Sequence, residues 1–409
     1  MPAILKNKRL VLGVSGGIAA YKAAELLRLL TGAGASVRVI MTRNAGWFVG
    51  KTTFEALSGR PVFSNMFDEA GEGSIRHIDW AREADAAVVA PATANIVGKL
   101  ANGIADDALS TFMMAVTAPK LICPAMNTHM YESPAVQRNL DRLRSDGFAI
   151  LVPDAGDLAC GTVGPGRLPD PSVIFDRLVH QLTSKDFAGL TVLVTAGPTR
   201  EHFDPVRFFS NPSSGKMGYA AARAAEHRGA RVVLISGPTA VSPPLNVETV
   251  FVESAEQMAA AVFQHAPNAD VVVKTAAVSD YRPGCRETQK IKKTDGSLTL
   301  TLEKTEDILR SLGKRKSKGQ VLVGFAAETE ALDAHAGQKL REKNLDLIAG
   351  NLLGGTDTGF GADTNRVTLF FSDGRKEALP VMGKEAVAHV LLDRIRLIIE
   401  SKSTVSPAG

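Results

Sequence analysis

The chain has 409 residues, of which 45% are hydrophobic and 22% charged, with 47 Lys and Arg against 43 Asp and Glu. These values are typical of a soluble globular protein with two domains. The net charge of +4 is too small to indicate nucleic-acid binding, and no segment is apolar for long enough to cross a membrane. Three cysteines without CxxC spacing argue against a disulfide framework or a zinc site and predict a reducing, cytoplasmic setting.

Two segments begin in the same way. "RLVLGVSGGIAAYK" and "GLTVLVTAGPTRE" each join a short apolar strand to a glycine turn. Further apolar strands follow each of them, separated by helical patterns, which predicts parallel sheets covered on both faces. We therefore expect an α/β protein with two doubly wound parallel-sheet domains, over residues 1–186 and 187–409. In such sheets ligands bind outside the carboxyl ends of the strands.

The glycine turn after the first strand has the composition of a phosphate cradle. Glycines let the backbone approach an anion, and the helix that follows offers free N–H groups. The turn does not match GxGxxG, and Thr42 stands where an NAD site would have an acidic residue. A mononucleotide such as FMN therefore fits better, and an ordinary packing turn is the alternative. The residues of the turn are Ser15, Gly16, Gly17 and Ile18.

Polar side chains follow two more strands of the first half. "APATAN" places Thr93 and Asn95 directly after a buried strand, where they can contact a flavin ring or ribityl chain. "CPAMNTHMY" places Asn127 and Met130 at the end of the next strand. Because the carboxyl ends of parallel strands meet at one edge, these side chains are expected in one ligand site.

Three further titratable residues of the first half need an interpretation. Cys160 lies in a glycine-rich loop, so it is either a reactive thiol on a flap or a bystander. His77 lies on a predicted helix, where a lone histidine is more often a surface residue than a catalytic one. Cys123 ends an apolar strand and is expected in the core.

Together, "SGGIAAYK", "APATAN", "PAMN" and "ACGTVGPGR" resemble the flavin-dependent cysteine decarboxylases, and among them the phosphopantothenoylcysteine decarboxylases. In the second half, "SNPSSGKMG", "TAAVSDYRP", "KIKK" and "GFAAET" resemble the phosphopantothenate–cysteine ligases. Nearly the whole chain thus resembles the bacterial bifunctional enzymes of coenzyme A biosynthesis. The resemblance implies a flavodoxin-like first domain and a Rossmann-like second domain.

The resemblance implies that the first half converts 4′-phosphopantothenoylcysteine to 4′-phosphopantetheine with FMN. The flavin would oxidise the cysteinyl thiol, CO₂ would leave, and the product would then be re-reduced. His77 matches the family's active-site base, Asn127 the residue that holds the substrate carboxylate, and Cys160 the proton donor. Met130 and Gly164 match substrate-binding positions. The implied FMN contacts are Ser15, Gly16, Gly17, Ile18, Thr42, Thr93, Asn95 and Ala125.

The resemblance also implies that the second half activates 4′-phosphopantothenate with CTP. The carboxylate would attack the α-phosphate, pyrophosphate would leave, and cysteine would attack the acyl-cytidylate, with Mg²⁺ offsetting the gathered negative charge. Asn211 matches the asparagine that processes the acyl-cytidylate, and Lys290 a catalytic lysine. A homo-oligomer without nucleic-acid or membrane partners is expected. The implied CTP contacts are Ala276, Ala277, Asp280, Lys290, Phe325, Lys339 and Lys343.

Some stretches depart from common patterns. "SNPSSGKMG" is not a P-loop, because Met217 stands where Ser or Thr would hold Mg²⁺. Thr305 and Glu306 replace a usual Asn-Pro in a segment that the resemblance implies contacts CTP, and Leu352 and Leu353 replace a usual Asp-Val.

Two alternatives remain at the level of sequence. An NADP-dependent oxidoreductase with two Rossmann-like domains would use Arg43 for the 2′-phosphate, but it leaves Asn127 and Cys160 without a role. A flavin-binding regulatory protein would have no need of His77 and Cys160. A visible spectrum separates the first alternative, because bound FMN is yellow and NADP is not.

Overall fold

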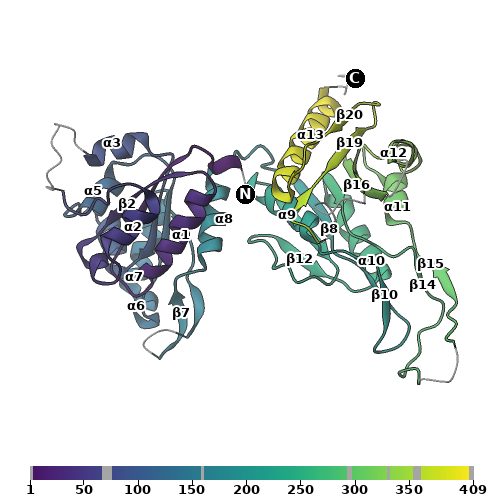
Figure 1. The fold of residues 1–409 in the computed structure, drawn as a ribbon, viewed down its shortest axis with the longest axis horizontal. Helices are drawn as coiled ribbons and strands as arrows, with labels where there is room; N and C mark the ends of the chain where they lie inside the picture. The colour runs from purple at the N-terminus through teal and green to yellow at the C-terminus, as the bar shows by residue number, and fades with distance from the viewer. Residues whose placement is uncertain are drawn as a thin grey trace. The chain divides into compact units, whose positions relative to one another are not determined.

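The chain divides into two compact units, Pro2–Thr183 and Ser184–Gly409 (Figure 1). The boundary predicted from the sequence, between residues 186 and 187, lies a few residues farther along. Each unit has its own sheet and its own core. The structure, a computed structural model, describes residues 3–66, 76–157, 161–292, 297–328, 332–352 and 361–404.

The first unit is built on five parallel strands. They are β1 (Arg9–Val14), β2 (Ser36–Met41), β3 (Ala86–Ala92), β4 (Lys120–Pro124) and β5 (Ala149–Ile150). Their spatial order is β2-β1-β3-β4-β5, the flavodoxin-like order of a doubly wound sheet. All seven residues of β3 are buried, because helices cover the sheet on both faces. The predicted fold class is confirmed for this unit.

Helices with apolar stripes cover both faces of the first sheet. One face carries α1 (Ala20–Gly32), α2 (Lys51–Ser58) and α8 (Pro171–Leu182). The other carries α3 (Arg76–Glu83), α4 (Ala94–Ala101), α5 (Ala108–Ala115) and α7 (Pro134–Ser145). The smaller elements are η1 (Ala3–Leu5), η2 (Arg43–Trp47), α6 (Thr128–Glu132) and the antiparallel pair β6 (Asp154–Asp157) and β7 (Val163–Arg167).

The second unit is built on an eight-stranded sheet. Its strands are β8 (Thr191–Ala196), β11 (Arg231–Ser236), β12 (Glu248–Phe251), β13 (Val271–Lys274), β16 (Val321–Glu328), β17 (Leu347–Leu352), β19 (Val367–Phe371) and β20 (Lys376–Ala378). The order is β12-β11-β8-β13-β16-β17-β19-β20, and its first six strands are parallel in the Rossmann order. The predicted Rossmann-like fold is therefore confirmed.

The last two strands add an antiparallel edge that the sequence did not lead us to expect. β19 pairs antiparallel with β17, and β20 pairs antiparallel with β19. The turn between them contains Asp373-Gly374, and Gly374 has φ +90°. An Asp-Gly pair between two apolar-rich runs is a hairpin signal. The preceding strands are all parallel, so their pattern alone predicts no antiparallel edge.

Helices cover both faces of the second sheet as well. One face carries α9 (Lys216–His227) and α13 (Lys384–Thr404), and the other carries α10 (Ala255–His265), α11 (Ile308–Arg315) and α12 (Leu332–Glu342). Among the helices described, none is long and apolar enough to span a membrane. The smaller elements are η3 (Ala266–Asn268), β9 (Arg200–His202), β10 (Phe208–Ser210), β14 (Tyr281–Pro283), β15 (Leu302–Lys304), β18 (Thr364–Asn365) and β21 (Met382–Gly383).

The segment that opens the second unit packs into that unit's core. Phe187 is fully buried in it, and Arg228 stacks over the Phe187 ring at 4.8 Å. Arg228 also donates through Nε to Asp186 Oδ1 at 2.8 Å and through Nη1 to Asp393 Oδ1 at 2.7 Å. This segment therefore belongs structurally to the second unit.

This packing predicts where the chain can be cut. A fragment that begins at Ser184 is expected to fold by itself, whereas one that begins at Leu190 loses Phe187 and is expected to be less stable. Removing a buried Phe side chain typically costs about 3–5 kcal/mol. Thermal unfolding of the two fragments measures the difference, with Phe187→Ala in the longer fragment as the matched control. Equal unfolding temperatures for the two fragments would contradict the prediction.

Candidate active sites

A cavity of about 1040 Å³ lies at the carboxyl ends of the strands of the first sheet. The segments after β1, β2, β3 and β4 line it, together with the start of α1 and the end of β7. It therefore brings together residues that are far apart in the sequence. The predicted site residues that line it are Ser15, Gly16, Gly17, Ile18, Thr42, Thr93, Asn95, Ala125, Asn127 and Met130.

Ser15 ties the ends of β1 and β3 together. Its hydroxyl donates to the Pro91 carbonyl oxygen at 2.8 Å and accepts from the Thr93 backbone N–H at 2.9 Å. Ser15 is buried, so this network is shielded from water. The hydroxyl thus holds the glycine turn in a fixed position at the edge of the cavity.

The two glycines of the turn differ in the space around them. A Cβ atom on Gly16 would lie 2.5 Å from Asn44 Cβ and 2.7 Å from the Asn44 carbonyl carbon, so no side chain fits there without a shift of the backbone. A Cβ atom on Gly17 would meet only Thr93 Cγ2, at 3.4 Å, which is an ordinary contact. Glycine is therefore required at position 16 for close packing, whereas at position 17 there is room for a Cβ atom.

Asn127 is held by its position at the start of α6. Its Oδ1 accepts from the His129 backbone N–H at 2.9 Å, as an N-cap residue does, and its Nδ2 lies 3.4 Å from Thr162 Oγ1. The neighbouring Met126 N–H donates to the Gly166 carbonyl oxygen at 2.9 Å. Gly166 has φ +138°, and a Cβ there would lie 2.2 Å from Met126 O, so only glycine permits this contact.

Lys99 lines the first cavity but was not among the predicted site residues. Its ammonium pairs with Asp106 at 2.6 Å and with Asp107 at 2.7 Å. Burial acts to lower the pKa of Lys99, but hydrogen bonds and charge attraction from the two carboxylates raise it above its usual value. Helical spacing in "NIVGKLANGIADD" does not indicate this ion-pair group, because α4 ends at Ala101 and both acids lie in the loop that follows.

The remaining residues predicted for the first site have other positions. His77 is half-buried on α3 and does not line the cavity. Gly164 lies on β7, where a Cβ would come within 2.7 Å of Thr128 Cγ2. Cys160 falls outside the described residues, so its role stays a prediction. Cys123 is fully buried, and burial raises the pKa of its thiol; its predicted place in the core is confirmed.

A second cavity, of about 510 Å³, lies at the carboxyl ends of β13, β16 and β17 in the second unit. The start of α9 and the start of α11 also line it. Five lysines and three carboxylates face this cavity, which gives it a positive balance suited to anionic ligands. Its predicted residues are Asn211, Ala276, Ala277, Asp280, Phe325, Lys339 and Lys343.

The loop after β13 is fastened to the segment before α11. Thr305 donates through its hydroxyl to Ser279 O at 2.6 Å and through its backbone N–H to Asp280 O at 2.9 Å. Asn211 donates through Nδ2 to Val278 O at 3.1 Å in the same loop. Thr305, which departs from the usual family residue, therefore helps to position Asp280 and also lines the cavity.

Lys274 is the clearest residue of the second cavity that sequence reasoning missed. It is the last residue of β13, after three fully buried valines, and it lines the cavity beside Lys343. Burial, and then repulsion from Lys343, lowers the pKa of Lys274 to about 8. A charged residue at the carboxyl end of a buried parallel strand was the available signal in "ADVVVKTAAV".

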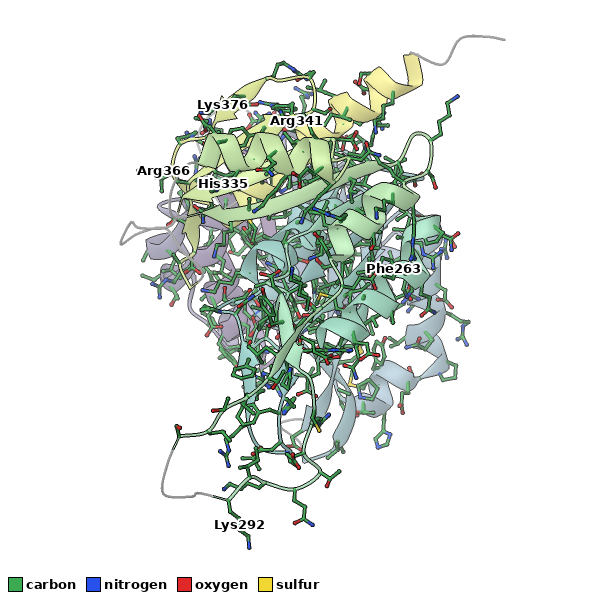
Figure 2. The ribbon with its side chains drawn as sticks, turned by 90° about the vertical axis from the view of Figure 1, so that its right-hand side faces the viewer. Phe263, Lys292, His335, Arg341, Arg366 and Lys376 are labelled. Carbon is green, nitrogen blue, oxygen red and sulfur yellow. The ribbon has the colours of Figure 1, made fainter. Side chains whose placement is uncertain are left out.

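Lys290 does not line the second cavity. It is exposed in the segment between β14 and β15, which Figure 1 shows on a long projection from the sheet. Figure 2 shows the nearby Lys292 toward the far end of this projection. Within the described residues, no group of three or more His, Cys, Asp or Glu is placed to hold a metal ion.

The fold and the two cavities define a two-domain α/β protein in which a nucleotide-type site and an anion site occupy separate units. Residues 2–183 match the Flavoprotein family, and residues 187–398 match the family described as DNA/pantothenate metabolism flavoprotein, C-terminal domain.

The chain is 51% identical over 405 residues to the coenzyme A biosynthesis bifunctional protein CoaBC of Bacillus subtilis (strain 168), covering 98% of this chain and 99% of that protein. It is 45% identical over 395 residues to CoaBC of Escherichia coli (strain K12), covering 96% and 97%. A crystal structure of the C-terminal domain of a CoaBC protein is 47% identical, with a TM-score of 0.47, and covers 53% of this chain and 100% of that one.

The chain therefore belongs to the family of coenzyme A biosynthesis bifunctional proteins. It is an enzyme with a flavoprotein decarboxylase half followed by a ligase half. The alternatives of an NADP-dependent oxidoreductase and a flavin-binding regulatory protein are not supported.

Proposed function

We propose that the second unit joins 4′-phosphopantothenate to cysteine with CTP, and that the first unit decarboxylates the resulting 4′-phosphopantothenoylcysteine with FMN. The observation that carries this proposal is the pairing of two cavities in one chain, one beside a glycine turn and one lined by lysines. The ligated product is the substrate that the decarboxylase needs. We also infer a cytoplasmic location from the small number of cysteines, of which the two described, Cys123 and Cys285, are free.

The first cavity has the features that FMN requires. Gly16 and Gly17 bring bare backbone to its edge at the start of α1, where free N–H groups favour a phosphate. The residues after β2 that line it, Thr42, Arg43 and Asn44, include no carboxylate for an adenosine ribose. Bound FMN would supply the two-electron oxidation and the later re-reduction that make loss of CO₂ possible.

The side chains of the first cavity then have distinct tasks. Asn127 presents a neutral amide, which can hold the substrate carboxylate without stabilising its charge as strongly as a cation would. Met130 supplies apolar surface for the substrate at the edge of the cavity. His77 acts as the base, and Cys160 returns the proton.

The FMN assignment predicts a loss of flavin in Gly17→Asp. The added carboxylate would repel the phosphate, while the surroundings of Gly17 leave room for its Cβ. Gly17→Ala is the matched control, because it adds the same Cβ without charge and is expected to keep flavin. Visible absorbance of the purified proteins measures the flavin content. Retention of FMN by Gly17→Asp at the wild-type level would contradict the assignment, as would a wild type that cannot be loaded with FMN.

The second cavity suits two anionic substrates. Its lysines fall into two groups: Lys216 and Lys384 near the start of α9 and α13, and Lys274, Lys339 and Lys343 around β13 and α12. We assign CTP to the second group, beside Asp280 and Phe325, and 4′-phosphopantothenate to the remaining part of the cavity. Asn211 donates to Val278 O and lies just before α9, and we assign it a contact with the acyl-cytidylate during the attack by cysteine.

Mg²⁺ would enter this cavity with the nucleotide. Mg²⁺ often binds through one or two carboxylates together with substrate phosphates, so a preformed protein cage is not needed. The cavity has three exposed carboxylates, on Asp280, Glu306 and Asp307. Glu306 accepts from Ser311 Oγ at 2.8 Å, so Asp280 is the residue we expect to hold the ion. Asp307 is already paired with Lys343 at 2.8 Å.

The overall proposal is tested by incubating the purified, flavin-loaded protein with 4′-phosphopantothenate, cysteine and CTP–Mg²⁺. Mass spectrometry is expected to show 4′-phosphopantetheine, CMP and CO₂. Without cysteine, the acyl-cytidylate is expected to remain. ATP in place of CTP tests the nucleotide. If neither the ligated nor the decarboxylated product forms from any of these mixtures, the proposal fails.

We further propose that the protein works as a homo-oligomer. His77, the proposed base, does not line the cavity that holds Asn127 in a single chain. A second copy that brings its α3 to the edge of this cavity would complete the site. Exposed apolar side chains near the cavity, such as Trp47 and Ile18, are 84% and 65% exposed and are suited to contact between copies.

A further inference from the structure

Among the residues that the structure describes, Lys274 has no partner for its charge, and it lies where an unpartnered charge is unfavourable. The strand before it is fully buried, and its own side chain is half-buried at the edge of the second cavity. No hydrogen bond or ion pair joins its ammonium to any residue in the part of the chain that the structure describes. A buried or half-buried lysine is normally paired, because removing its charge from water without a counter-ion costs free energy.

The acidic groups around Lys274 do not serve as that counter-ion. Asp307 acts as the N-cap of α11, accepting from the Arg310 N–H at 3.0 Å, and it pairs with Lys343 at 2.8 Å. Asp280 is exposed to solvent at the start of the projection. Both carboxylates attract the Lys274 charge, but burial and Lys343 outweigh them. In the free protein, none of the described carboxylates therefore pairs with the Lys274 ammonium.

We infer that Lys274 is a further nucleotide-binding residue of the ligase site, whose ammonium takes a phosphate oxygen of CTP as its missing counter-ion. This inference rests on the proposed function. The nucleotide is favoured over 4′-phosphopantothenate because the charges that act on Lys274 are Lys343, Asp307 and Asp280, which surround the proposed CTP position. Lys216 and Lys384 influence each other and Asp363 instead.

CTP binding through Lys274 is expected to depend on pH. Below about pH 8 the Lys274 ammonium is mostly charged and can hold the phosphate; as the pH rises past this value the free protein loses the proton, and CTP binding weakens. The nucleotide does not add to this change, because its last phosphate pKa is about 6. Burial also lowers the pKa of Lys384, with Lys216 adding to the effect, so the decisive quantity is the difference between wild type and a Lys274 variant.

The test is CTP–Mg²⁺ affinity by calorimetry, on the full-length protein, at pH 7.5 and pH 9. Lys274→Met is expected to lower CTP affinity by about tenfold or more at pH 7.5, the size of one lost charge-assisted hydrogen bond, and by much less at pH 9. Lys274→Arg stays charged at both pH values, so its affinity is expected to change less with pH than that of the wild type. Lys318→Met is the matched control, because Lys318 is exposed just before β16, at the opposite edge of the sheet.

The CTP affinities of the variants decide whether Lys274 binds the nucleotide. If Lys274→Met binds CTP as tightly as the wild type, or loses the same factor at both pH values, the inference is overturned. The same holds if only the affinity for 4′-phosphopantothenate, measured separately, is reduced. If the wild type itself does not bind CTP, the proposed function fails and the inference fails with it. Unchanged far-ultraviolet circular dichroism and thermal unfolding of each variant show that a loss of affinity is not a loss of fold.

Discussion

Asn211→Asp is expected to release pyrophosphate once and then to stop with the acyl-cytidylate bound. Lys290→Gln is expected to form no acyl-cytidylate at all. The two residues are assigned to successive steps, because their side chains offer different chemistry. Lysine is a point charge suited to phosphate oxygens that gain charge as pyrophosphate leaves. An amide can donate to a carbonyl or phosphoryl oxygen of the mixed anhydride, which a carboxylate cannot do.

The position of Asn211 supports this division. Its Nδ2 donates to Val278 O at 3.1 Å, which orients the amide in the loop that lines the cavity. An aspartate would place its charge against that carbonyl oxygen and would lose the donor. Removing one oriented donor at a developing oxyanion commonly lowers the rate by about a hundredfold to a thousandfold. We expect a defect of that size in the attack by cysteine.

The measurement is the pyrophosphate burst against the amide product in a single turnover. Lys292→Gln is the matched control for Lys290→Gln, because it removes a charge from the same projection two residues away. It is expected to behave close to the wild type. Two variants blocked equally before pyrophosphate release would show that the assignment of steps is wrong, even if the ligase activity is intact.

Much of the fold follows from the sequence because parallel sheets have a simple pattern. Continuous apolar runs such as "AAVVAPA" and "TVLVTA" cannot lie at a solvent-facing surface, and the helical segments between them require crossovers. The strand ends could therefore be located, and with them Thr93 and Asn127, whereas Asp280 was predicted from the resemblance alone. The antiparallel edge of the second sheet escaped because it depends on a single Asp-Gly turn rather than on a repeated pattern.

The sites were predictable where a polar side chain follows a strand and less so elsewhere. Lys274 was missed because it is the last residue of β13, and a lysine at that position can simply mark the end of a buried strand without binding a ligand. Lys99 was missed because its role depends on two carboxylates in a later loop. His77 and Lys290 were identified by resemblance, and neither lines the cavity of its unit. A matching motif indicates the chemistry of a residue but not its distance from the other residues of the site.

The second large effect concerns His77 and Asn127, which we expect to act in one site from two chains. Each single variant, His77→Asn and Asn127→Asp, is expected to release no CO₂ from 4′-phosphopantothenoylcysteine. Asn127→Asp keeps an oxygen that can cap α6 in place of Oδ1, but it repels the substrate carboxylate. His77→Asn removes the base while leaving α3 with a polar residue of smaller size.

Co-expression of the two variants distinguishes a shared site from a site within one chain. In a closed ring of copies, a shared site is functional when its Asn127 comes from the His77→Asn chain and its His77 from the Asn127→Asp chain. With equal amounts and random mixing this holds for about one quarter of the sites, whatever the number of copies in the ring. Co-expressed protein is therefore expected to regain about a quarter of the wild-type rate of 4′-phosphopantetheine formation, measured by mass spectrometry.

The control is a mixture of the two variants purified separately and combined just before the assay, which stays inactive if the copies exchange slowly. If co-expression gives no more activity than the single variants, the two residues do not come from different chains. In that case α3 would have to move so that His77 reaches the cavity of its own chain. The cavity contains Ser15, Thr93 and Asn127 but not the proposed base, as expected if each chain were to provide the cofactor cradle and its neighbour the base.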